Sequence, residues 1–163
     1  MMRINFLTLL CLGFLTLGVF SCGDDESSMA TPDYESVAVG QMEMNYNGED
    51  WTSTTVTGIN STAISTITAE GGLNLIFMVL ENTDPGTYTV GGSNLTSITV
   101  RNLVASEEFS TSNEATASGE IIIAEKNTTD KTISGSFNAI VVAENGESRT
   151  VGTGLFNQIS YSQ

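Results

Sequence analysis

The chain has 163 residues, with 5 Lys and Arg, 19 Asp and Glu and no His, so its formal charge is −14 and its length suits one domain. A chain this acidic repels phosphate backbones and anionic headgroups, so we expect it to bind neither nucleic acid nor a membrane through a basic surface. The lack of His excludes Ser-His-Asp and Cys-His catalytic arrangements, His-containing zinc sites and an ordinary general base that titrates near neutral pH.

Residues 1–21 are predicted to be an export signal peptide. Arg3 supplies the positive charge, and an apolar run follows over residues 6–20. The run ends at Val19-Phe20-Ser21-Cys22, which resembles a bacterial lipobox, where the signal peptidase cuts ahead of a lipid-modified cysteine. We therefore expect lipidation of Cys22. Two alternatives stay open, namely cleavage as an ordinary secreted protein and an uncleaved anchor, since the run approaches the ~20 residues that span a bilayer.

Residues 22–36 are predicted to be the lipidated cysteine and a flexible acidic tether. The segment carries five carboxylates, no basic residue and few apolar ones, so it buries too little surface to offset the cost of ordering. The acidic residues directly after Cys22 resemble the export signal of surface lipoproteins of Bacteroidota, which implies outward display. Cys11 lies in the leader, so the rest of the chain has no thiol for a disulfide or for catalysis.

Residues 37–163 are predicted to form one all-β domain, because short runs of Val, Ile, Thr and aromatic residues alternate with Gly, Asn and Asp. The predicted strands are 37–46, 51–57, 63–70, 73–80, 87–90, 95–104, 117–125, 131–144 and 149–161, with a loop at 106–116. Hairpin turns are indicated at Asn47-Gly48, at Gly71-Gly72 and at Asn145-Gly146. Such short connections favour antiparallel neighbours. The expected architecture is an antiparallel β-sandwich, with a closed lipocalin-like β-barrel as the alternative.

The run at 73–80 is apolar on both faces, because Leu75 and Phe77 alternate with Ile76 and Met78. Both faces need cover, so the run is either a central strand under a loop or the tether, or an exposed patch that receives a partner. Several glycines also fall inside strand patterns, where glycine often marks a bulge, a barrel corner or close packing under a bulky neighbour. Phe137, Phe156 and Trp51 are candidates for such a neighbour.

Candidate binding residues are few. Trp51 and Tyr88 are able to stack on sugar rings, although such aromatic residues more often pack in the core. Met78 is a candidate because it lies in the run 73–80, which is apolar on both faces. The adjacent acids Glu49-Asp50 and Glu107-Glu108 leave a carboxylate-based glycoside hydrolase as a further alternative function. The loops at 81–84 and 127–130 hold oxygen ligands that suit calcium, but neither has the spacing of an EF-hand, and ordinary Asx-turn chemistry is the commoner explanation of such residues. We assign no catalytic residue, no metal site and no cofactor.

The whole pattern resembles the uncharacterised β-domain lipoproteins of Bacteroidota. The residues that carry the resemblance are the lipobox cysteine, the acidic tether, an early NG-x-x-W turn from Asn47 to Trp51 and a late ISG-x-F strand from Ile133 to Phe137. The resemblance implies an all-β fold and a place in the cell envelope, and it supplies no catalytic residue.

The sequence therefore predicts a lipoprotein of the outer membrane or cell surface whose domain is a non-catalytic binding or interaction module. It would contact the membrane through the lipid on Cys22 and bind a protein or glycan. The alternatives are a lipocalin-like carrier of a small apolar ligand, which needs an internal cavity, and the glycoside hydrolase, which needs converging carboxylates.

Overall fold

The computed structural model describes residues 33–61, 65–72 and 74–162, so the predicted signal peptide, Cys22 and residues 23–32 of the tether lie outside the described residues. The described part contains one 3₁₀ turn, η1 (Tyr34–Ser36), and 11 strands. The strands are β1 (Gln41–Tyr46), β2 (Glu49–Thr52), β3 (Thr55–Asn60), β4 (Ser65–Gly71), β5 (Asn74–Leu80), β6 (Gly86–Val90), β7 (Ser97–Asn102), β8 (Glu107–Ser110), β9 (Ser118–Asn127), β10 (Thr132–Val142) and β11 (Ser148–Ser162). Within these residues, no helix has the length and apolar character needed to cross a bilayer.

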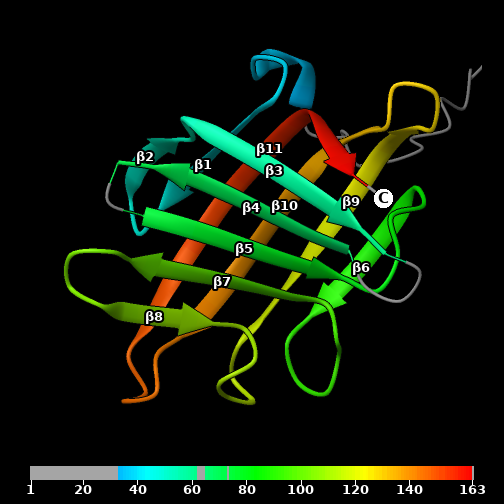
Figure 1. Cartoon of the computed structure of the whole chain (residues 1–163). Coiled ribbons are helices and arrows are strands. Elements are labelled where there is room, and N and C mark those ends of the chain that lie inside the picture. The colour runs from blue at the N-terminus through cyan, green and yellow to red at the C-terminus, as the bar shows by residue number, and fades with distance from the viewer. Residues whose placement is uncertain (1–32, 62–64, 73, 163) are drawn as a thin grey trace, which may run out of the picture.

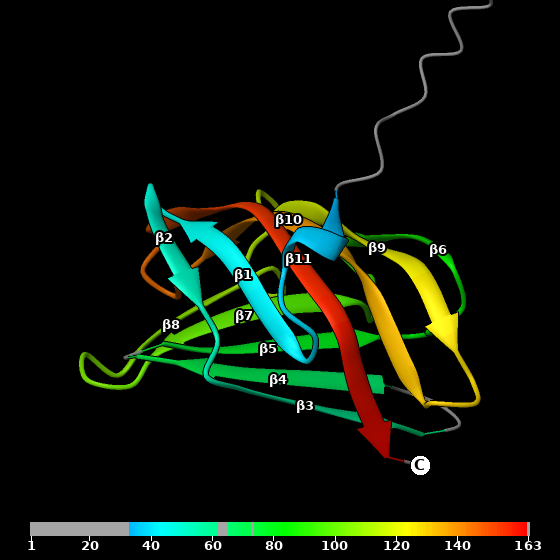
Figure 2. The ribbon, with the colours of Figure 1, turned by 90° about the horizontal axis from the view of Figure 1, so that it is seen from above.

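All 11 strands belong to one mostly antiparallel sheet, in the order β2-β1-β11-β3-β4-β5-β7-β8-β10-β9-β6. The sheet bends into two layers whose strands cross, one of β3, β4, β5, β7 and β8 and the other of β2, β1, β11, β10, β9 and β6 (Figures 1 and 2). Two short junctions connect the layers, a parallel pairing of Tyr161 and Ser162 with β3 and the single pair Val142–Ser110. Because β10 also pairs with β11, a ring of strands closes, but it is not a regular barrel.

The all-β prediction is confirmed, and the structure combines parts of both expected architectures, with facing layers and a closed ring. The hairpins at Asn47-Gly48, Gly71-Gly72 and Asn145-Gly146 are present, and each contains at least one residue at positive φ. Two predictions about strands are wrong. The predicted strand 51–57 is divided between β2 and β3, and the predicted loop 106–116 contains β8.

The core between the layers is a single cluster of buried side chains, including Met42, Met78, Phe109, Phe137 and Phe156. Phenylalanine and glycine alternate across the β10–β11 pair, because Phe137 lies opposite Gly154 while Phe156 lies opposite Gly135. A β-carbon at Gly154 would overlap the Phe137 ring, and one at Gly135 would lie 2.9 Å from the Phe156 ring. The predicted packing of aromatic rings onto strand glycines is therefore confirmed at these two pairs.

Strand β5 is a central strand between β4 and β7, which is one of the two alternatives that its two apolar faces left open. Ile76, Met78 and Leu80 are fully buried on the core side. The opposite face carries Leu75, Phe77 and Val79, which are half-buried. The Arg101 guanidinium lies 5.7 Å from the centre of the Phe77 ring and covers part of that face.

The end of the predicted tether contacts the domain. Asp33 precedes the η1 turn, and the Tyr34 hydroxyl donates a hydrogen bond of 3.3 Å to Glu125 on β9. Val37 is buried, and its carbonyl accepts a hydrogen bond of 2.8 Å from the buried Asn157 side chain. Packing against the domain therefore begins a few residues before β1.

Candidate functional site

The inward face of one layer changes from apolar to polar at one end. Asn74 on β5 pairs with Asn102 on β7, which pairs with Glu107 on β8. Side chains alternate between faces along a strand, so these three residues share the inward face with the buried row Ile76, Val100 and Phe109 two positions further along. The polar row lies where β5 and β8 begin and β7 ends, at the left in Figure 1.

Arg149, near the start of β11, reaches this row from the other layer. Its guanidinium carbon lies 4.1 Å from the centre of the Phe109 ring and 5.9 Å from that of Tyr46 on β1. It forms ion pairs of 3.3 Å with Glu107 and 3.2 Å with Glu147. The positive charge is therefore matched by two carboxylates and held over an aromatic ring.

The Arg149 and Tyr46 side chains also interact electrostatically. Burial raises the pKa of Tyr46, and the hydrogen bond and charge of Arg149 offset only part of that rise. Burial by itself would lower the pKa of Arg149, but its interactions with Tyr46 and Glu147 raise that pKa overall. Tyr46 is thus a neutral hydroxyl and Arg149 a permanent cation over the physiological range.

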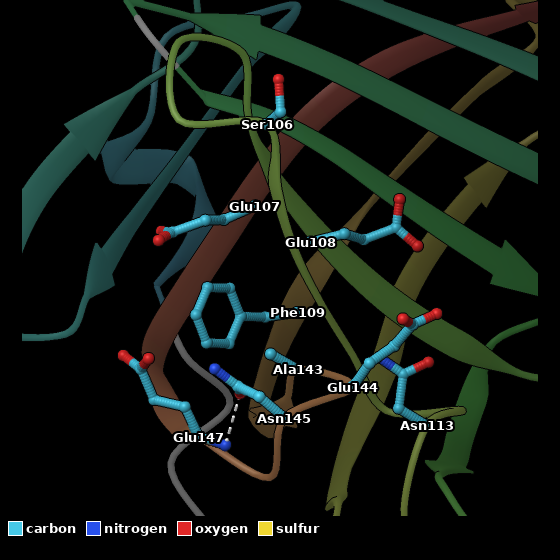
Figure 3. A pocket seen from close by; sticks show the side chains of 9 residues that line it. All are labelled: Ser106, Glu107, Glu108, Phe109, Asn113, Ala143, Glu144, Asn145 and Glu147. Carbon is cyan, nitrogen blue, oxygen red and sulfur yellow. Dashed lines mark hydrogen bonds between the residues drawn. The ribbon is translucent and has the colours of Figure 1, made fainter.

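Two cavities adjoin the Arg149 cluster. The first, of about 260 Å³, is lined by Tyr46, Asn47, Glu49, Asn74, Asn102 and Arg149, and we call it the amide pocket. The second, of about 420 Å³, is lined by nine residues around Phe109 that include the two carboxylates paired with Arg149 (Figure 3). Figure 3 shows the carboxylates of Glu107 and Glu147 on one side of the Phe109 ring and Glu144 and Asn113 on the other.

The amide pocket contains an unsatisfied polar atom. Asn74 Oδ1 is buried and accepts no hydrogen bond from any residue that the structure describes. The neighbouring Asn102 Oδ1 accepts hydrogen bonds from the backbone N–H groups of Val104 and Ala105, at 3.0 and 2.9 Å. Buried polar atoms are nearly always paired, but this oxygen has less than 1 Å² of accessible surface, so a ligand in the pocket would not reach it in this conformation.

The candidate residues expected from the sequence lie elsewhere and do not come together. Trp51 is 9% exposed, belongs to the core cluster and donates its indole N–H to the Gly71 carbonyl at 2.8 Å. Tyr88 is half-buried, and its hydroxyl donates to the Asp84 carbonyl at 2.6 Å. Met78 is fully buried in the core. Trp51 and Tyr88 lie on β2 and β6, the two end strands of the sheet.

The adjacent carboxylates expected from the sequence point apart, because successive residues of a strand face opposite sides. Glu107 binds Arg149 on the inward side, whereas Glu108 binds Arg101 on the outer face of the same layer. Glu49 and Asp50 are likewise consecutive on β2. Neither pair has the geometry of two carboxylates that flank one glycosidic bond.

The loops that suited calcium form Asx turns. Asn82 Oδ1 accepts the backbone N–H of Asp84 at 3.0 Å, and Asn127 Oδ1 accepts those of Thr129 and Asp130 at 2.9 and 3.0 Å. Asp84 also binds Lys126 at 2.8 Å. In the part of the chain that the structure describes, no group of three or more acidic residues is placed to hold a metal ion.

Comparison with known proteins identifies a family. The profile of a domain of unknown function (DUF6252) matches residues 39–160, which include β1 to β10 and nearly all of β11. Neither a curated protein nor a solved structure matches the chain. The matched region holds the two layers, the Arg149 cluster and the amide pocket, and the chain therefore belongs to the DUF6252 family.

Proposed function

We propose that the chain is a lipid-anchored, non-catalytic binding module displayed on the outer surface of a bacterial cell envelope. The lipobox at Cys22, the leader before it and the acidic tether after it support the anchor and the export. The resemblance to β-domain lipoproteins of Bacteroidota supports the outer membrane as its location. The membrane contact is then the lipid, and the domain is free to bind a soluble or surface partner.

One observation supports binding most directly, namely the polar row at the end of an otherwise apolar interior. The core-facing positions of β5 and β7 are apolar along the strands and become amides only at Asn74 and Asn102. These two amide residues line the amide pocket together with Tyr46 and Arg149, so polar side chains meet a concave surface there. We therefore place the binding site in the amide pocket.

The packed interior favours this function over that of an apolar carrier. A carrier needs an internal cavity, and the space between the layers holds the fully buried side chains of Met42, Phe109, Phe137 and Phe156. The opposite directions of Glu107 and Glu108 likewise favour binding over glycoside hydrolysis.

A thermal-shift experiment separates the three functions. The full-length chain, purified in detergent, is melted with neutral monosaccharide glycosides, with a short uncharged peptide and with palmitate. A ligand that binds only the native state stabilises it and so raises the melting temperature. At a free ligand concentration of 100 times the Kd, the added stability is about 2.7 kcal/mol. We expect a shift with a polar probe and none with palmitate. A shift with palmitate alone, release of the sugar from a glycoside, or no shift with any probe would contradict the proposal.

A further inference from the structure

We infer that two copies of this chain associate through the outer face of the layer formed by β3, β4, β5, β7 and β8. We call this surface the β5 face, because β5 is its central strand. It lies on the opposite side of the layer from the amide pocket, so the inference does not depend on the proposed function. Three properties of the β5 face support it, which are its composition, its lack of cover and its symmetry.

The β5 face is almost uncharged, although the chain has a formal charge of −14. Because side chains alternate between faces, the strand register sorts its residues into rows that cross the strands. The first row is Thr55, Glu70, Leu75, Arg101 and Glu108, the second is Thr57, Thr68, Phe77, Thr99 and Ser110, and the third is Ile59, Thr66, Val79 and Ser97. Every charge lies in the first row. Leu75, Phe77 and Val79 form a half-buried apolar stripe, and Ile59 is 61% exposed, as is typical of a contact surface.

No segment that the structure describes covers the β5 face. In Figure 1 these strands lie in front of the other layer, and no other described strand crosses in front of them. The described end of the predicted tether lies against the other layer, since Tyr34 binds Glu125 on β9 and the Val37 carbonyl accepts from Asn157 on β11. The occupant of the β5 face is therefore expected to be a second molecule.

The composition of the β5 face is nearly symmetric about β5. On both sides of Phe77 and Val79 the neighbouring strands carry small hydroxyl residues. These are Thr66 and Thr68 on β4 and Ser97 and Thr99 on β7. Only the neighbours of Leu75 differ, because Glu70 on β4 and Arg101 on β7 carry opposite charges. A surface of this kind is complementary to a second copy of itself.

A two-fold axis parallel to β5 brings the matching groups together. Stacked sheets align their strands to within about 30°, so this axis places β5 over β5 and β4 over β7 of the second copy. Phe77 then lies over Phe77 of the second copy, and Glu70 lies opposite Arg101 of the second copy, twice by symmetry. Among the described residues Glu70 forms no ion pair, and the side chains of Arg101 and its partner Glu108 are 48% and 43% exposed. Both groups are therefore accessible to a second copy.

Sedimentation equilibrium of the full-length chain in density-matched detergent measures the number of chains in each complex. We expect two chains for the unaltered protein, also at raised detergent concentration, where chains that merely share a micelle separate. Val79→Lys puts a charge inside the interface, so the Kd of the dimer should rise at least about 10-fold. Ile140→Lys is the matched control, because Ile140 is 43% exposed on the outer face of the other layer, and it should leave the Kd unchanged. Thr66→Lys replaces Val79→Lys if circular dichroism shows the latter to be unfolded.

A charge exchange tests which residues meet across the axis. Glu70→Arg places two positive charges opposite each other, and Arg101→Glu places two negative charges there, so each single variant should raise the Kd at least about 10-fold. The double variant Glu70→Arg/Arg101→Glu restores opposite charges and should recover most of the lost affinity.

Three outcomes would overturn the inference. An unaltered chain that sediments as a single chain at every concentration has no such dimer. A dimer that Val79→Lys weakens no more than Ile140→Lys uses another surface. If the double variant dissociates as readily as the two single variants, Glu70 does not lie opposite Arg101 of a second copy, and the inferred arrangement is wrong.

Discussion

Arg149 on β11 contacts Glu107 and Phe109 of the other layer, at the end of the interior where the polar row lies. Substitutions of Arg149 show whether its ion pairs or its contact with Phe109 stabilise the fold. Arg149→Met removes the charge and keeps a long apolar side chain over Phe109. The Arg149 side chain is 22% exposed, and its partners Glu107 and Glu147 are 48% and 51% exposed. Without Arg149 both carboxylates therefore remain hydrated, and the variant leaves no uncompensated buried charge.

The magnitude follows from the two kinds of contact. Exposed ion pairs contribute ~0–1 kcal/mol, and a partly desolvated cation over an aromatic ring contributes ~0.5–2 kcal/mol. Since the guanidinium lies only 4.1 Å from the centre of the Phe109 ring, we assign most of the effect to this stacking. Arg149→Met should lower the free energy of unfolding by about 1–3 kcal/mol. Arg149→Lys keeps the charge and loses the planar stacking, so it should cost more than half as much.

Urea unfolding at two salt concentrations provides the assay. The Debye length falls from ~10 Å at ~0.1 M salt to ~3 Å at ~1 M, so exposed ion pairs are screened while a stacked contact is not. We expect the loss in Arg149→Met to persist at the higher salt. If Arg149→Lys is as stable as the unaltered chain, and the loss in Arg149→Met disappears at high salt, the ion pairs dominate and the stacking argument is refuted.

Four further predictions follow from the fold and the sequence. Met78→Asp should unfold the domain or lower its free energy of unfolding by several kcal/mol, since it buries an unpaired charge. The control Met78→Leu should lower that free energy by less than ~1.5 kcal/mol. Circular dichroism melts measure both, and a stable Asp variant would show that Met78 is not in the core. Gly154→Ala should cost about 1–3 kcal/mol by urea unfolding, because the new methyl group meets the Phe137 ring, and an unchanged stability would contradict that contact. Burial raises the pKa of Tyr46 above its usual value of 10.0, so its contribution to stability is complete below pH 10 and is lost as the pH rises through the folded-state pKa; Tyr46→Phe should reduce this alkaline loss in pH-dependent melts, and an unchanged profile would argue against it. Cys22→Ala should yield an unprocessed or soluble product in cell fractionation, and an unaltered chain that is wholly soluble after leader cleavage would refute lipidation.

Much of the fold follows from local patterns. The hairpin turns and the packing of bulky side chains on strand glycines were predictable from turn residues and glycines inside strand patterns. The pairing of Phe137 with Gly154 was not, because it depends on the register of β10 with β11. Strand β8 was missed because its sequence, Glu-Glu-Phe-Ser, is acidic and short, and its pairing with β7 and, at Ser110, with β10 makes it a strand. The division between β2 and β3 was missed because Ser53 and Thr54 carry no turn signal.

The site was harder to predict because its residues are distant in sequence. Asn74, Asn102 and Arg149 come together only through the register of β5 with β7 and the crossing of β11 over that layer. A local signal does exist at Asn74. Its side chain lies on the same face of β5 as the buried Ile76 and Met78, so an amide stands where the pattern predicts an apolar residue. Trp51 and Tyr88 were preferred as candidates because aromatic residues often line binding sites, and the structure instead uses Trp51 to pack on Gly71.

Chemical-shift mapping tests the central claim, that the polar end of the two layers is a binding site. The full-length chain, isotopically labelled and in detergent, is titrated with neutral monosaccharide glycosides, and the signals of the backbone amides, the Asn side-chain amides and the Arg149 guanidinium are followed. We predict that the largest changes occur at Asn74, Asn102 and Arg149. Changes centred on Phe77 of the outer face, or no change at any amide, would contradict the account.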